Sequence, residues 1–184
     1  EGPELGGAGA ELSQAIRQEA TAVLGSRAVF AEDLDGLRNT LTTANLCRDG
    51  QLVLSEIATL AGVADCGTAF VVVLVGAESY MPQCLTGKAV LVDTAAAGVL
   101  AERVVRLDLA DPGTAAAYEH YLQNVRGFRA GNLESDREDR VHTAMLSPSH
   151  FRRFAAYAMV ADLFAGEDTP QPLHLAGGRG RRDR

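Results

Sequence analysis

The chain has 184 residues, of which 47% are apolar and 22% charged, enough for one sizeable hydrophobic core and too few for two. Its longest unbroken apolar run, residues 69–75, is far shorter than the roughly 18 residues that a membrane-spanning helix needs, so we expect a soluble protein with no membrane contact. The net charge of -7 disfavours a broad nucleic-acid surface, because such a surface needs clustered cations to offset phosphate charge.

The two ends of the chain differ in composition from its middle. Residues 1–9 are rich in Gly and lack periodicity, so we expect a flexible segment there, followed by a single domain over 10–166. Residues 167–184 end in an arginine-rich run and predict a flexible basic tail that binds nucleic acid at most weakly. Lys88 is the one lysine among 17 basic residues, which is typical of a GC-rich source. No signal peptide is evident, which favours a cytoplasmic or otherwise intracellular location, although Glu1 leaves open the removal of a targeting segment.

The first periodic segment predicts an amphipathic helix. Apolar residues recur at helical spacing from about Ala10 to Leu24, and Gly25 follows them. We expect residues 33–39 to be helical and 40–47 to be extended. Asp49-Gly50 then favours a hairpin turn, with a helix over about 52–63 as the alternative.

Residues 54–63 have the spacing of a short helix that ends near Gly62. With Ala58 four residues before Gly62, the stretch resembles the first helix and turn of a lac repressor-type helix-turn-helix. That resemblance would imply a recognition helix in the next segment, but residues 68–74 hold no side chain able to read a base edge. We therefore predict that this segment does not bind DNA.

Three apolar runs, 69–75, 89–92 and 104–109, have the length, β-branched content and turn punctuation of strands. The dozen residues 76–87 predict a protruding loop between the first two, and Asp93-Thr94 predicts a helix cap for residues 95–102. The resulting ββαβ order predicts an α+β domain with a mixed, mainly antiparallel sheet of four or five strands, covered by helices.

Two further helices complete the expected fold. Asp111-Pro112-Gly113-Thr114 begins a helix over 115–125, residues 129–142 form a charged loop, and Ser147-Pro148-Ser149 begins a helix over 149–165. The last helix is apolar almost all round, so it is either the central helix of the core or the binding site for a partner chain. The candidate interface residues are Phe151, Phe154, Tyr157, Met159 and Phe164.

Polar residues at the strand ends are the candidates for chemistry, because a sheet gathers such groups where its strands stop. They are Glu78, Ser79, Tyr80, Asp93 and Asp108. Capping and turn roles explain the aspartates equally well. The four histidines are widely separated and Cys47, Cys66 and Cys84 form no Cys-x-x-Cys pair, so we expect free thiols, no metal site and no cofactor, with Cys47 and Cys66 as small core residues.

These patterns favour a non-catalytic interaction or assembly subunit that binds a protein partner or a second copy of itself. The alternative is a small enzyme or small-molecule-binding domain with its site at the sheet ends, near Glu78, Ser79, Asp93 and Asp108.

Overall fold

The computed structural model describes residues 3–33, 46–48, 51–125 and 141–164, and its centre is a three-stranded antiparallel sheet. The strands lie in the order β3 (Thr68–Glu78), β4 (Cys84–Asp93) and β5 (Gly98–Asp108). They contain the three apolar runs that the sequence predicted, which confirms the α+β class. The prediction of a four- or five-stranded sheet is not confirmed, since the only other strands of the described part, β1 (Cys47–Arg48) and β2 (Gln51–Leu52), form a separate ribbon.

The connection between β4 and β5 is a turn, so the predicted helix over 95–102 and the mixed sheet are wrong. The carboxylate of Asp93 accepts hydrogen bonds from the backbone N–H groups of Ala95 (2.8 Å) and Ala96 (3.2 Å). Ala97 then takes a positive φ of 47°, which reverses the chain into β5. The Asp that we expected to cap a helix therefore closes a hairpin.

The connection between β3 and β4 is also shorter than predicted. Pairing continues to Glu78 opposite Cys84, so the loop is residues 79–83 and not the whole of 76–87. A β-bulge between Leu74 and Gly76 shifts the register along β3 and lets both strands continue past the glycine. Gly76, which the sequence predicts to follow the end of a strand, instead marks a bulge within β3.

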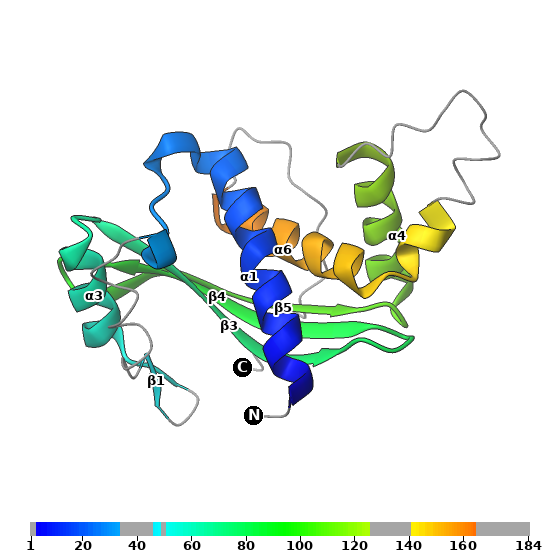
Figure 1. Ribbon diagram of the computed structural model, residues 1–184, viewed down its shortest axis with the longest axis horizontal. Coiled ribbons are helices and arrows are strands. Elements are labelled where there is room, and N and C mark those ends of the chain that lie inside the picture. The colour runs from blue at the N-terminus through cyan, green and yellow to red at the C-terminus, as the bar shows by residue number, and fades with distance from the viewer. Residues whose placement is uncertain (1–2, 34–45, 49–50, 126–140, 165–184) are drawn as a thin grey trace, which may run out of the picture.

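Helices α1 (Pro3–Leu24) and α6 (Pro148–Phe164) lie side by side on one face of the sheet, which we call the helix face (Figure 1). The bounds of α6 agree with the prediction, whereas α1 begins at Pro3 rather than near Ala10. A helix tolerates proline in its first turn, and each glycine destabilises it by only about 1 kcal/mol relative to alanine. The glycines of residues 1–9 led us to predict a later start for this helix. Gly25, at a positive φ of 59°, ends α1 as predicted. Two short 3-10 turns follow, Gly25–Arg27 and Ala31–Asp33.

The main core fills the space between these helices and the sheet. Its floor consists of residues at alternate positions of each strand, as expected when one face of a sheet is buried. They are Phe70, Val72, Leu74, Leu85, Ala89, Val105 and Leu107.

Helix α3 (Leu54–Val63) packs on the opposite face, which we call the far face, at one end of the sheet (Figure 1). Ile57 of α3 lies against Val90 and Val92 of β4. The predicted hairpin and the alternative helix over about 52–63 are both confirmed in part. The two-residue strands β1 and β2 pair antiparallel, and α3 begins two residues after β2. The segment predicted as extended, 40–47, lies largely outside the described residues, as does most of 33–39.

Helix α4 (Pro112–His120), a π-helical turn (Tyr121–Val125) and the helical residues 141–145 close the end of the core where β5 stops. Tyr118 stacks on Phe154 with ring centroids 5.1 Å apart, and its hydroxyl donates a hydrogen bond of 3.1 Å to the Ala144 carbonyl. The charged loop predicted for 129–142 lies outside the described residues except at its last two positions. No described helix is long and apolar enough to cross a membrane.

Candidate functional site

The structure brings Glu78 and Asp108 together at one end of the sheet. Cys84 lies between them, because it pairs with Glu78 on β3 and with Asp108 on β5. Directly paired residues project from the same face, so the three side chains form a row across the far face. Ser79 and Tyr80 follow in the adjoining loop, and the Tyr80 side chain is 81% exposed.

Asp93 lies at the other end of the sheet. It pairs with Thr68 and Gly98, whereas Cys84 begins the same strand. The ten residues of β4 at about 3.4 Å each separate the two ends by roughly 30 Å. Asp93 therefore cannot share a site with Glu78 and Asp108, and the four-residue site that the sequence suggested is divided.

Both aspartates bind backbone groups of their own turns. Asp93 closes the β4–β5 hairpin, and a carboxylate oxygen of Asp108 accepts a hydrogen bond of 2.9 Å from the backbone N–H of Ala110. Asp111, three residues further on, accepts 2.8 Å and 3.0 Å bonds from the backbone N–H and hydroxyl of Thr114, which hold its pKa below the usual value. These contacts are those of turn and helix caps.

The Cys84 thiol is not activated for nucleophilic chemistry. Burial raises its pKa, and the neighbouring carboxylates of Glu78 and Asp108 raise it further. A raised pKa lowers the thiolate fraction at neutral pH, and the thiolate is the reactive form. All three cysteines are free thiols, as predicted, but Cys47 is exposed and so is not a core residue.

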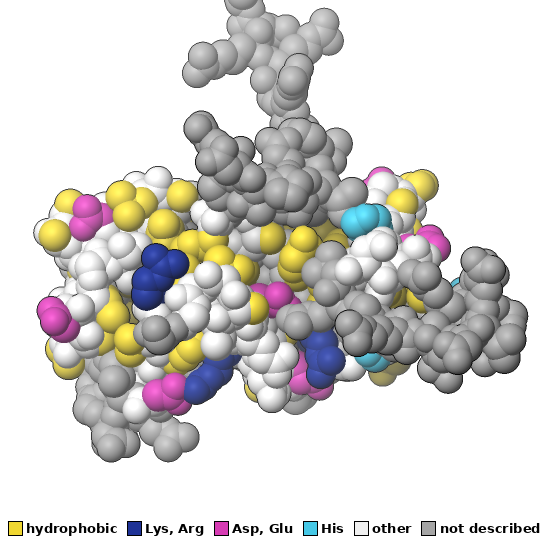
Figure 2. Space-filling model, turned by 90° about the horizontal axis from the view of Figure 1, so that it is seen from above, with side chains coloured by type: hydrophobic (Ala, Val, Ile, Leu, Met, Phe, Trp, Pro, Cys, Tyr) yellow, Lys and Arg dark blue, Asp and Glu magenta, His cyan; other side chains and the backbone are white. Residues whose placement is uncertain are grey.

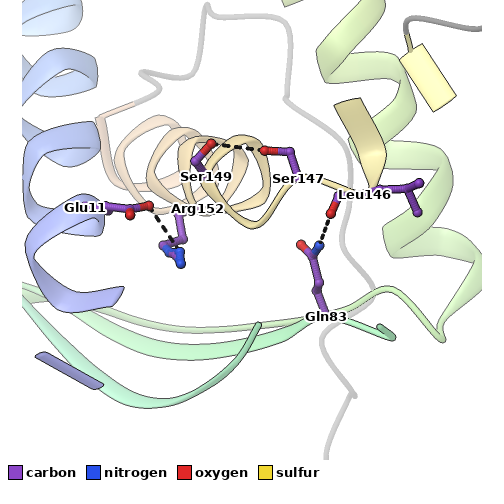
Figure 3. A network of polar contacts seen from close by, with 6 residues as sticks. All are labelled: Glu11, Gln83, Leu146, Ser147, Ser149 and Arg152. Atoms are coloured by element: carbon purple, nitrogen blue, oxygen red, sulfur yellow. Dashed lines mark hydrogen bonds and ion pairs between the residues drawn. The ribbon is translucent and has the colours of Figure 1, made fainter. Parts of the chain in front are cut away.

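The hollow beside this end of the sheet is very small. Its volume is about 10 Å³, close to the room that one water molecule needs. Gln83 lines it, and the amide nitrogen of this buried residue donates a 2.9 Å bond to the Leu146 carbonyl, while its oxygen has no hydrogen-bond partner among the described residues (Figure 3). Arg152, which also lines this hollow, forms a 3.1 Å ion pair with Glu11 that joins α6 to α1.

A larger hollow lies at the opposite end, near Asp93, with a volume of about 310 Å³. Its walls come from the turns that follow α3 and β4, and they lack the large apolar side chains that usually hold a small molecule; they are Gly62, Asp65, Cys66, Gly67, Thr94 and Ala95. The Thr94 hydroxyl, which lines it, donates a 2.8 Å bond to the Cys66 carbonyl. The Thr94 hydroxyl is thus already engaged in a hydrogen bond within the chain.

The candidate interface residues of α6 lie inside the molecule. Phe151, Phe154 and Met159 are 2% exposed or less, and Tyr157 and Phe164 are half-buried. Tyr157 lies 5.1 Å from the ring of Tyr121, and Phe164 lies edge-on to Phe70 at 5.4 Å. These side chains thus pack within the core, and the interface role that the sequence left open for this helix stays a prediction.

Some of the exposed apolar side chains lie on the sheet. Val104 on β5 is 65% exposed and Val75, at the bulge of β3, is 63% exposed. Val104 pairs with Lys88, whose ammonium forms a 2.9 Å ion pair with Glu102 on the far face. The sequence signal of this surface is weak, since the charged residues Glu102, Arg103 and Arg106 stand among the apolar ones without a regular alternation.

Two kinds of site have no counterpart in the described residues. No group of three or more His, Cys, Asp or Glu side chains is placed to hold a metal ion within the described ranges. Figure 2 views the helix side of the molecule, where the described acidic and basic side chains are scattered rather than gathered in one basic patch. The segment after α3 is strand β3, so the described part has no recognition helix to follow α3.

Comparisons with protein-family models, with characterised proteins and with solved structures found no match to this chain.

Proposed function

We propose that this chain is a non-catalytic interaction or assembly subunit that binds a protein partner through its sheet. The observation that carries the proposal is the exposure of Val104 on the far face of the sheet and of Val75 at the bulge of β3, while the helix face is closed by α1 and α6. An apolar side chain that remains largely exposed on a regular strand gains free energy when a partner covers it, at about 25 cal/mol per Å² of apolar area.

The chemistry of the sheet ends supports a binding role over catalysis. The carboxylates of Asp93 and Asp108 are engaged with backbone N–H groups, and the thiol of Cys84 has a raised pKa. The hollow beside Glu78 has room for about one water molecule, which is too small for a substrate.

The test compares the wild type with two sheet variants, Val75→Asp and Val104→Asp, as baits in an extract of the source organism. Val63→Asp is the matched control, because Val63 is 68% exposed on α3, away from the exposed part of the sheet. Unfolding in urea first establishes that all variants are folded.

We expect mass spectrometry to detect a protein that the wild type and the Val63→Asp control retain and that at least one sheet variant loses. Equal retention of every protein, the untagged copy of this chain included, by all four baits would contradict the proposal. A turnover activity lost on replacing Glu78 or Ser79 would contradict it as well, and would favour the small enzyme.

A further inference from the structure

Within the described part of the chain, the outer edge of β5 carries a charge pattern that specifies a partner. β5 is an end strand of the sheet, and no described strand pairs with its outer edge. An unpaired edge presents a row of backbone N–H and C=O groups that a further strand can bind. The other edge strand, β3, has its bulge well inside the strand. The register shift between β4 and β5 lies near the start of β5, opposite Leu91 and Val92. A regular ladder can therefore form along Ala101–Asp108.

The charges along β5 are self-complementary when two copies run antiparallel. If Val104 lies opposite Val104 of a second copy, Glu102 of each copy lies opposite Arg106 of the other, and Arg103 lies opposite Val105. Glu102, Val104 and Arg106 all project from the far face, and all three are exposed. The two-fold axis produces the Glu–Arg pair twice.

Neighbouring registers lack this match. Centring the axis on Glu102, Arg103 or Arg106 sets that residue against its own like-charged copy, and centring it on Val105 sets Glu102 against Asp108. Like charges directly opposite each other on paired strands are destabilising, whereas opposite charges stabilise the pair. Among these five registers, the charges thus select the one centred on Val104.

We propose that the partner is a second copy of this chain, bound edge to edge through β5 in an antiparallel register centred on Val104. The two sheets join into one six-stranded antiparallel sheet. Because the two-fold axis is perpendicular to that sheet, both pairs of α1 and α6 helices lie on the same side, and the far faces form one continuous surface. This inference rests on the proposed interaction function and names its partner.

Charge reversal tests the register directly. Glu102→Arg sets Arg against Arg twice in each dimer, and Arg106→Glu sets Glu against Glu twice. The double variant Glu102→Arg/Arg106→Glu restores opposite charges in the reversed sense. An equimolar mixture of the two single variants also restores them, but only between unlike chains. Glu56→Arg, an exposed reversal on α3, is the matched control for the change in net charge.

Sedimentation velocity and native mass spectrometry measure the outcome. We expect the wild type and the Glu56→Arg control to form a dimer with twice the 19.4 kDa mass of the chain. Each single variant should weaken the dimer by about tenfold or more, because two favourable pairs become two repulsive ones. The double variant should recover the dimer, and the mixture should form mainly the mixed dimer.

Two results would overturn the proposal. A wild type that stays monomeric at the highest soluble concentration would exclude self-association, while a partner lost by Val75→Asp or Val104→Asp in the extract would still sustain the interaction function. A dimer that the single reversals leave unchanged would place the contact elsewhere than β5. Circular dichroism of each variant separates these results from a loss of fold.

Discussion

The packing of α6 on the sheet depends on Gly87 of β4, and this dependence can be tested with one added methyl group. Gly87 is buried, and a Cβ built on it would fall well inside contact distance of Met159 Cε and 3.4 Å from Met159 Sδ. The next nearest atom, the Val73 carbonyl oxygen, is at an ordinary 3.5 Å. The cost of Gly87→Ala thus arises almost entirely from Met159.

The magnitudes follow from that geometry. Inserting a methyl into a packed core costs about 1 to 3 kcal/mol, and we expect the lower half of this range because the end of a methionine side chain can move. Met159→Ala removes a fully buried side chain and should cost about 2 to 5 kcal/mol. In the double variant Gly87→Ala/Met159→Ala the clash is gone and the new methyl occupies part of the cavity.

The double variant should therefore be more stable than the sum of the single effects predicts, by about 0.5 to 3 kcal/mol. Urea unfolding followed by circular dichroism measures the three free energies, since the chain has no tryptophan. Gly76→Ala is the control, because a Cβ there meets no atom within 4 Å and should change stability little. Additive single effects, or an equal cost at Gly76, would refute the reasoning.

Three further outcomes can be measured. Asp111→Ala should lower the urea midpoint at neutral pH, and the difference from wild type should shrink as the pH falls through the lowered pKa of Asp111, because only the ionised carboxylate holds the Thr114 N–H strongly. Tyr118→Phe should cost about 0.5 to 1.5 kcal/mol in urea unfolding, because it removes one of two hydrogen bonds to the Ala144 carbonyl, which also accepts a 3.0 Å bond from the Ser147 N–H. Burial raises the pKa of Tyr121 from 10.0 to about 12, so the unfolded chain loses that proton first. The free energy of unfolding should therefore fall between these two pH values, with the tyrosinate absorbance of Tyr121, taken as the difference from Tyr121→Phe, appearing together with unfolding. A flat difference for Asp111→Ala, an unchanged midpoint for Tyr118→Phe, or early titration of Tyr121 in the folded protein would each contradict its prediction.

Local signals determined much of the fold. The β-branched runs specified β3, β4 and β5, the Asp-Pro-Gly-Thr motif specified the start of α4, and Ser-Pro-Ser specified the start of α6. These signals hold because they act through neighbouring backbone groups, and Asp111 binds Thr114 as the motif implies.

Tertiary contacts decided the connections and the surfaces. The sequence could not show that Asp93 closes a hairpin rather than a helix, since the same carboxylate satisfies the first N–H groups of either structure. The sequence also could not show that the candidate site residues lie at two ends of the sheet. Asp93 ends β4, whereas Asp108 pairs with Cys84 at the start of β4, and this follows only from how the strands pair. The role of α6 was equally undecided in the sequence, because a core helix and an interface helix carry the same apolar residues. Burial of Phe154 and exposure of Val104 depend on which elements lie across from them, and only the folded chain contains that information.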